Sequence, residues 1–320
     1  MESSTRPSQE MTSGHPRPLP PLSRMMALER RRARRRLWTG LAFMAPAILF
    51  VAVFLLYPVA FNVYVSLTQW AKFSGFDRFA GLENYVLVFT SPKFGEAALN
   101  TGIWIVASLV FPVVLGLALA LLLRGLQFQE ALKSVFFLPR MFSATAVGVI
   151  WYYVYGNQGI INSFLRGLGL GGLVERWLYE PLWATPSMIL THVWQTVGLI
   201  MVLLLLGLNA LPSEPIEAAK VDGAGRWQVF RHVILPLLMP TLLVVTIVSV
   251  LAGFTSFDLV WVMGRDYPNR STLTLAVNQY WESFRANQWA YGSALAVILG
   301  FFALGVTWIQ TVLQHRLERR

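Results

Sequence analysis

A short polar stretch between two strongly apolar segments holds the residues whose types and spacing most clearly point to a task. The stretch EAAKVDGAGRWQVFRHVILP begins at Glu217 and contains five charged side chains. Its first part has a helical pattern that can end at Gly223, because glycine readily adopts a positive φ. In a second helix over residues 226–234, Trp227 and Phe230 share one face. These residues suit binding rather than catalysis, and the pattern leaves two surfaces open, a partner protein or the membrane.

The sequence has no motif for nucleotide binding or hydrolysis. The form G-x-x-x-x-G-K followed by Ser or Thr does not occur. The glycine-rich stretch YGNQGIINSFLRGLGLGG from Tyr155 lacks that lysine and a flanking strand, so it is expected to be a flexible connection. The chain has no cysteine and therefore no disulfide. We predict no catalytic residues, no metal ligands and no cofactor held by this chain, which is then not an enzyme.

The elements that position the polar stretch are membrane helices. Of the 320 residues, 55% are hydrophobic and 13% are charged, whereas soluble domains have about 25% charged residues. A membrane helix needs about 20 apolar residues, and the alternation typical of a membrane barrel is absent. The sequence thus predicts an all-α, polytopic protein with six transmembrane helices, approximately over Leu37–Leu67, Ala97–Leu123, Val135–Tyr155, Trp183–Leu208, Leu235–Met263 and Trp289–Leu313.

Basic residues are distributed unequally between the two sides of these helices. The net charge is +10, and the segments on one side hold 17 Lys and Arg against 8 on the other. This asymmetry predicts that both termini and the loop at about 210–236 are cytoplasmic, and it argues against nucleic acid as a partner. Residues 1–36, rich in Ser, Pro and Arg, are expected to form a disordered cytoplasmic tail near anionic lipid. Residues 37–320 are expected to form the transmembrane domain.

The polar stretch matches a known signature. The letters EAA from Glu217, the glycine at Gly223 and the letters VILP from Val233 resemble the signature loop of inner-membrane permeases of binding-protein-dependent ABC importers, with Val where Ile is usual. The run GLNALPSEPIEAAKVDGAGRWQVFRHVILPLLMPTL, together with GLENY, NTGIW and FFLP, resembles the carbohydrate-uptake branch of maltose and multiple-sugar type. The chain departs from that branch at MGRDYP, from Met263.

This resemblance implies the type I ABC importer permease fold, in a bacterial or archaeal cytoplasmic membrane. It also implies three partners: a second permease subunit, commonly a distinct paralogue, an ATPase dimer that binds ATP and Mg, and an extracytoplasmic solute-binding protein. The substrate would be a sugar, an oligosaccharide or a polyol. The loop would couple to the ATPase through Glu217, Ala218, Ala219, Asp222, Gly223, Trp227, Phe230, Leu235 and Pro236.

Uncharged polar and aromatic residues occupy the middles of the fourth and fifth spans. Ionisable side chains are nearly absent there, with His192 and Asp258 near the outer ends, which disfavours a secondary transporter acting alone. These groups suit a neutral polyol, although helix packing also explains them. A phosphorylated polyol such as glycerol 3-phosphate stays open if the partner permease supplies a basic residue, and so does a non-transporting scaffold. By the resemblance, the candidate pathway residues are Trp194, Gln195, Thr196, Ser249, Gly253, Thr255 and Ser256.

Overall fold

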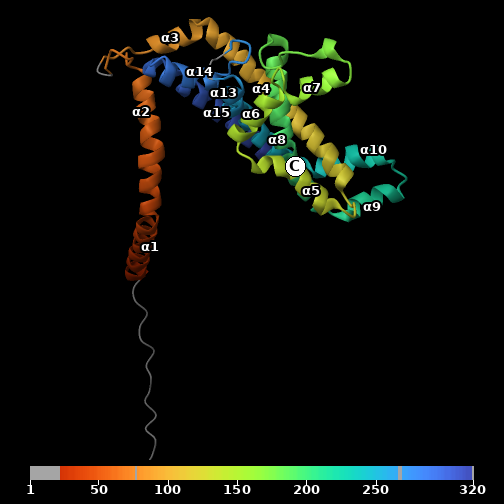
Figure 1. Ribbon diagram of the computed structural model, residues 1–320. Helices are drawn as coiled ribbons and strands as arrows, with labels where there is room; N and C mark the ends of the chain where they lie inside the picture. Colours follow the sequence, from red (N-terminus) through yellow and green to blue (C-terminus); the bar gives the residue numbers. More distant parts are fainter. Residues whose placement is uncertain (1–21, 76–77, 266–268, 319–320) are drawn as a thin grey trace, which may run out of the picture. The chain divides into compact units, whose positions relative to one another are not determined.

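The computed structural model describes residues 22–75, 78–265 and 269–318 (Figure 1). The chain divides into two compact units, residues 1–60 and residues 61–320. Helix α1 (Leu22–Val51) passes through a π-helical turn (Ala52–Leu56) into α2 (Tyr57–Ser66). The segment predicted to be a disordered tail is therefore helical from Leu22 onward, since its Arg, Ala and Leu residues favour helix. Its residues 1–21 lie outside the described residues.

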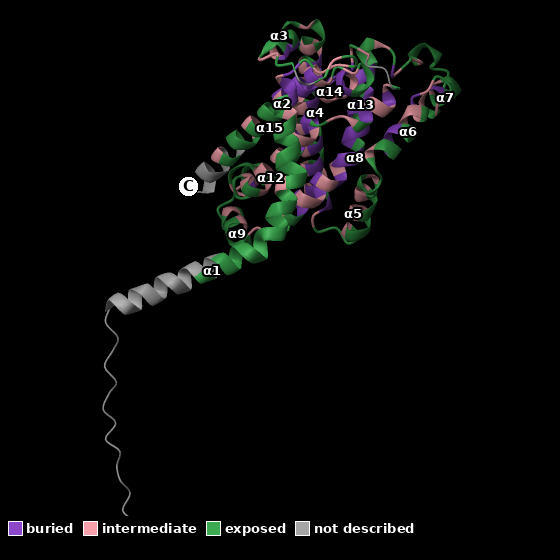
Figure 2. Cartoon of the chain, turned by 90° about the vertical axis from the view of Figure 1, so that its left-hand side faces the viewer, coloured by how far each residue is buried: buried purple, intermediate pink, exposed green. Residues whose placement is uncertain are grey.

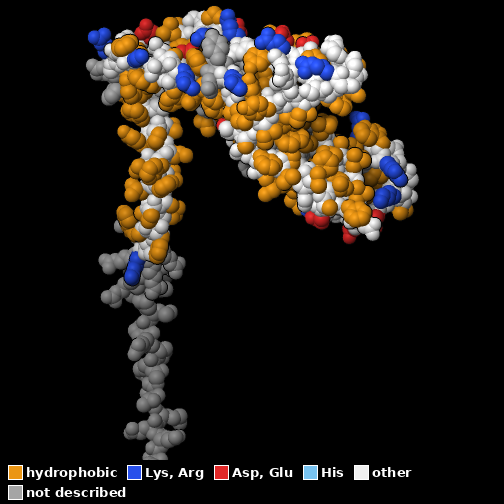
Figure 3. Space-filling model, in the orientation of Figure 1, with side chains coloured by type: hydrophobic (Ala, Val, Ile, Leu, Met, Phe, Trp, Pro, Cys, Tyr) orange, Lys and Arg blue, Asp and Glu red, His pale blue; other side chains and the backbone are white. Residues whose placement is uncertain are grey.

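The second unit is built from helices that run between two polar ends. Among the described residues of the whole chain, five helices are long and apolar enough to span a membrane, and there are six spans if a bent helix pair is counted as one, which agrees with the predicted all-α fold. On the face drawn in Figure 3, hydrophobic side chains cover the middle of this unit, and charged ones gather at its ends. Its helices are α3 (Glu83–Thr90), α4 (Pro92–Leu123), α5 (Gln129–Phe137), α6 (Ala144–Val154), α7 (Ile160–Gly167), α8 (Pro181–Asn209), α9 (Ser213–Val221), α10 (Arg226–Val229), α11 (Leu235–Leu237), α12 (Met239–Phe254), α13 (Asp258–Met263), α14 (Leu275–Tyr280) and α15 (Trp289–Glu318).

The third span is broken, so the prediction of one continuous helix over 135–155 is wrong in that respect. The segments Gln129–Met141 and Ala144–Val154 meet at an angle of 93°. Pro139 lies in a 3₁₀ turn at the end of the first segment, and the chain leaves the helical conformation at Phe142, which is extended with φ of −82° and ψ of 143°. The hydroxyl of Ser143 accepts a hydrogen bond from the Ala146 N–H at 3.2 Å and so caps a new helix.

Helices α4, α8 and α12 form the tightly packed centre of the unit, where most buried residues lie (Figure 2). Small residues allow this approach. A Cβ on Gly116 of α4 would lie 2.9 Å from Ile200 of α8, and one on Gly253 of α12 would lie 2.7 Å from the Cα of Ile105. Close backbone contact of this kind holds membrane helices together, because lipid provides no hydrophobic drive for their association.

The segment 269–275 lies across the end of the unit that is farther from the 210–236 loop. The side-chain amide of Asn100 donates to the carbonyls of Arg270 and Leu273 at 3.1 and 3.0 Å. Thr101 accepts from the Leu275 N–H at 2.9 Å, and Thr185 donates to the Ser271 carbonyl at 2.9 Å. This segment is thus fixed to α4 and α8. The preceding residues 266–268, within the divergent MGRDYP stretch, lie outside the described residues.

Candidate functional site

The first arm of the 210–236 loop is helix α9, which ends in a Schellman motif. Gly223 has φ of +82°, and its N–H donates to the Lys220 carbonyl at 3.1 Å. The Ala224 N–H donates to the Ala219 carbonyl at 2.9 Å. These two bonds satisfy carbonyls that the helix end leaves open, and the geometry needs a residue that tolerates positive φ. The sequence prediction of a helix that ends at Gly223 is confirmed.

The second arm continues into a membrane span without a loop. The Gly225 N–H donates to the side-chain oxygen of Gln228 at 2.8 Å, which caps the start of α10. A π-helical turn (Phe230–Ile234) and α11 follow and lead into α12. Val229 is buried, and Ile234 packs against the cluster of Leu204, Leu205 and Leu238. This arm is therefore packed against the bundle and directly continuous with α12.

The loop has a surface of both apolar and polar side chains, and the rest of the described chain leaves this surface exposed. Trp227 is 67% exposed and its ring lies 5.5 Å from that of the half-buried Phe230. Val221, 88% exposed, adds an apolar side chain to this surface that the sequence pattern did not single out. Of the other predicted coupling residues, Glu217, Ala218, Asp222, Gly223 and Pro236 are exposed and Ala219 and Leu235 are half-buried. Ala219, Asp222 and Gly223 come together beside a hollow of about 400 Å³, which Gln228 and His232 also line.

The three candidate pathway residues on α8 differ in what they can contact. Trp194 is 39% exposed and packs edge-on against Trp151 at 5.4 Å. Gln195 is buried, and its amide donates to the Phe142 carbonyl at 3.0 Å, so it holds the break in the third span. Thr196 is buried and donates to the His192 carbonyl at 2.7 Å within its own helix. Of the three, Trp194 has the most surface for a ligand.

The four candidates on the fifth span divide in the same way. Gly253 faces the α4 backbone and Ser249 is buried, so both lie at helix contacts within this subunit. Ser256 is half-buried, and neither its hydroxyl nor that of Ser249 has a hydrogen-bond partner among the described residues. Thr255 is exposed at the break between α12 and α13. The structure therefore does not bring all seven candidates into one pocket.

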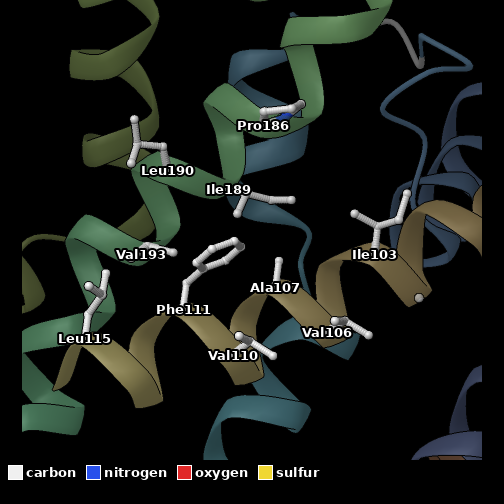
Figure 4. A pocket seen from close by; sticks show the side chains of 11 residues that line it. Ile103, Val106, Ala107, Val110, Phe111, Leu115, Pro186, Ile189, Leu190 and Val193 are labelled. Atoms are coloured by element: carbon white, nitrogen blue, oxygen red, sulfur yellow. The ribbon is translucent and has the colours of Figure 1, made fainter. Parts of the chain in front are cut away.

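Two hollows of the bundle differ sharply in chemistry. One, of about 710 Å³ between α4 and α8, is lined by apolar residues and glycine alone, including Ile103, Phe111 and Leu190 (Figure 4). It offers no hydrogen bond to a carbohydrate. The other, of about 460 Å³, combines Thr255 and Gln279 with the rings of Phe257 and Tyr280, among other residues. An aromatic face beside hydrogen-bonding groups suits a sugar. Within the described residues, no three His, Asp or Glu side chains are placed to hold a metal ion.

Comparison with known proteins identifies the architecture. The family described as "Binding-protein-dependent transport system inner membrane component" matches residues 112–319. A probable ABC transporter permease of Pyrococcus horikoshii is 32% identical over 266 residues, 82% of this chain and 91% of that protein. The multiple sugar-binding transport system permease of Streptococcus mutans is 31% identical over 291 residues, 91% and 98% of the two chains. A chain of a bacterial ABC transporter for import of the acidic polysaccharide alginate shares the fold, with a TM-score of 0.77 at 22% identity, over 90% and 99% of the two chains.

Proposed function

The chain belongs to the family of binding-protein-dependent transport system inner membrane components, and on that premise we propose that it is the subunit through which an ATP-driven importer moves a carbohydrate into the cell. It is a multi-pass protein of the cytoplasmic membrane and a permease component of an ABC transporter. The observation that carries the proposal is the rigid two-helix loop, continuous with α12. The carbohydrate class is supported by the sequence resemblance and by the sugar permease of Streptococcus mutans.

The proposed mechanism uses the loop as a lever. A separate ATPase dimer holds ATP and Mg and closes when ATP binds. The 210–236 loop docks into a groove of one ATPase subunit through Trp227 and its neighbours. Because the second arm is continuous with α12 and the first follows α8, ATPase closure displaces both spans and opens the pathway outward. A solute-binding protein then delivers the substrate, and ATP hydrolysis reverses the change. Coupling requires that both sites act on one two-state element.

The first experiment is an ATPase assay on the assembly of this chain, its partner permease, the ATPase dimer and the cognate binding protein, reconstituted in vesicles. The panel contains mono-, di- and trisaccharides, polyols, uronic acids and glycerol phosphates. We expect one carbohydrate to stimulate ATP hydrolysis and to accumulate in the vesicles. Stimulation only by an amino acid, a peptide or a metal ion would overturn the carbohydrate assignment, and hydrolysis without accumulation of any solute would overturn transport itself.

We expect Trp227→Ala to weaken binding of the ATPase dimer about 10- to 100-fold, because an exposed aromatic anchor typically contributes about 2 kcal/mol or more at an interface. The measurement is the dissociation constant of the purified permease pair for the ATPase dimer in detergent. Phe73→Ala is the matched control, since Phe73 is 95% exposed and lies outside the loop. Equal affinities for the two variants would show that Trp227 does not contact the ATPase.

We expect Thr255→Trp to fill the hollow of about 460 Å³ and to lower carbohydrate uptake at least about tenfold. Basal ATPase activity should stay near that of the natural chain, because Thr255 is exposed at the end of α12 that is farther from the loop. The measurement is initial uptake of the radiolabelled substrate into vesicles. Thr90→Trp places the same bulk at an exposed position of α3 and serves as the control. Unchanged uptake in Thr255→Trp would remove this hollow from the pathway.

A further inference from the structure

Arg140 is a charged residue in the middle of a membrane-spanning bundle. It lies in the 3₁₀ turn Leu138–Met141, which ends the first half of the broken third span. The sequence shows Arg140 only near the start of an apolar segment, where an arginine is ordinary. The structure places Arg140 deeper in the membrane than the sequence suggests, because helix α5 precedes it and already spans the first part of the membrane.

The depth follows from two contacts with α8, the straight span beside it. A Cβ on Gly198 would lie 2.9 Å from the Cα of Phe137, and Gln195 donates to the Phe142 carbonyl at 3.0 Å. Gln195 is the central residue of the 29-residue helix Pro181–Asn209, and so lies about 21 Å from either end of it. Arg140, between Phe137 and Phe142, is therefore level with the centre of that span.

The direction of α5 supports the same depth. Leu132 of α5 packs against a hydrophobic cluster whose α8 members, from Ile200 to Leu208, all lie between Gly198 and the loop end of α8. Residues 136–142 then contact α8 at Gly198 and Gln195. Residues 129–142 thus run along α8 from its loop end to its middle, where the chain turns, and Arg140 lies at this turn.

Arg140 is exposed in this subunit, and its side chain has no hydrogen bond or ion pair with any other described residue. His192 is not near the outer end of the fourth span, as the sequence suggests, but lies on α8 one turn from its central residue Gln195, close to the depth of Arg140. A charged side chain at the centre of a membrane is costly, and such residues face a water-filled cavity or a partner rather than lipid. The N-terminus of α6, a few residues on, adds partial positive charge. An anion is the occupant this position favours.

We propose that Arg140 is a specificity-determining residue of the translocation pathway and that it binds an anionic group of the transported carbohydrate. The group is a carboxylate, phosphate or sulfonate, whose oxygens match the guanidinium in a paired hydrogen-bond geometry. This proposal rests on the proposed function and deepens it from a carbohydrate to an acidic one. It also replaces the expectation that this chain lacks a basic residue in its spans and suits a neutral polyol.

The first test asks whether position 140 lines an aqueous pathway, whatever the substrate is. The natural chain has no cysteine, so Arg140→Cys introduces a single thiol. The assembled transporter is treated with a membrane-impermeant thiol reagent in the resting state and after trapping with ATP and vanadate, and modification of this chain is read by mass spectrometry. We expect modification in at least one of these states. Val114→Cys, 60% exposed and well inside the span α4, should stay unmodified. Absence of modification at position 140 in both states would overturn the proposal.

The second test measures substrate charge and the role of the guanidinium. Uptake is compared for pairs that differ in charge, such as a uronic acid oligosaccharide with its neutral counterpart and glycerol 3-phosphate with glycerol. We expect the acidic member to be transported. Arg140→Gln should raise its KM about 10- to 100-fold, as expected for loss of a charge-assisted hydrogen bond. Arg140→Lys should restore part of the affinity, and Arg124→Gln, at the end of α4, should leave the KM unchanged.

Each outcome separates this proposal from the function it rests on. If a neutral carbohydrate is transported, the assignment of Arg140 fails and the carbohydrate importer stands. If the substrate is an anion that is not a carbohydrate and Arg140→Gln still raises its KM, the carbohydrate assignment fails and the role of Arg140 stands. If Arg140→Gln instead disrupts assembly with the partner permease, and loss of an acidic residue on that partner restores it, Arg140 forms an inter-subunit ion pair and the proposal is overturned.

Discussion

Gly223→Val is expected to lower carbohydrate uptake more than tenfold, through loss of the connection to the ATPase. Gly223 has φ of +82°, a conformation that costs an ordinary residue about 1–2 kcal/mol and a β-branched residue more. The valine would force the turn to open and would break the two hydrogen bonds that end α9. The arm that carries Glu217 would then leave its position relative to Trp227. The measurement is vesicle uptake together with the amount of ATPase that co-purifies.

Gly225→Ala is the control for this prediction, since it adds a methyl group two residues away in the same loop. Gly225 has φ of −66°, and an added Cβ would lie 3.6 Å from the Gln228 side chain, an ordinary contact. We expect uptake and ATPase binding within about twofold of the natural chain. Full uptake in Gly223→Val would mean that the loop needs no fixed turn, and the lever mechanism would have to be given up.

Gly198→Ala is expected to destabilise the folded subunit by about 3 kcal/mol, the upper part of the range for overpacked cores. The added Cβ would lie 2.5 Å from the carbonyl carbon of Phe136 and closer still to its oxygen. These are backbone atoms of α5, which cannot rotate away as a side chain can. The methyl group would separate α5 from α8 and weaken the hydrogen bond from Gln195 to Phe142. The measurement is the yield and apparent melting temperature of the purified assembly in detergent.

Gly102→Ala provides the comparison, because a Cβ on this membrane-helix glycine of α4 would meet nothing within 4 Å. Alanine also favours helix over glycine, so we expect an unchanged or slightly higher melting temperature. If Gly198→Ala and Gly102→Ala melted at the same temperature, the close contact between α5 and α8 would not be part of the native packing.

The spans and the loop could be predicted from the sequence because each depends on local composition. A run of about 20 apolar residues is sufficient for a span, and the turn at Gly223 needs only glycine after a helical pattern. The break in the third span is different. Hydropathy averages over a window, so a bent pair of half-helices and one straight helix have the same composition. The depth of Arg140 in the membrane depends on that break, so it could not be predicted from the sequence.

Membrane glycines and small polar residues were ambiguous for a related reason. The sequence predicts Gly253 as a candidate pathway residue, yet in the structure it faces the backbone of α4. Glycine permits close approach of a ligand and of a helix equally well, and only the tertiary structure distinguishes the two. The glycine-rich stretch after Tyr155 was expected to be a flexible connection, but it contains helix α7. Buried Asn162 in this stretch donates to the Glu175 carbonyl at 2.9 Å and accepts from the Trp177 ring N–H at 2.8 Å. Local sequence patterns do not predict such hydrogen bonds.

The hydrogen bonds of Asn100 have a consequence for how the protein is made. Its partners, the carbonyls of Arg270 and Leu273, are 170 and 173 residues further along the chain. During synthesis α4 therefore enters the membrane long before these carbonyls exist, and its buried amide must be satisfied temporarily by water, lipid headgroups or the insertion machinery. In chains truncated before residue 270, the amide of Asn100 would lack these partners, and we expect such chains to be degraded more readily by quality-control proteases. The last sixth of the polypeptide is thus needed before the hydrogen bonds of the second span are complete.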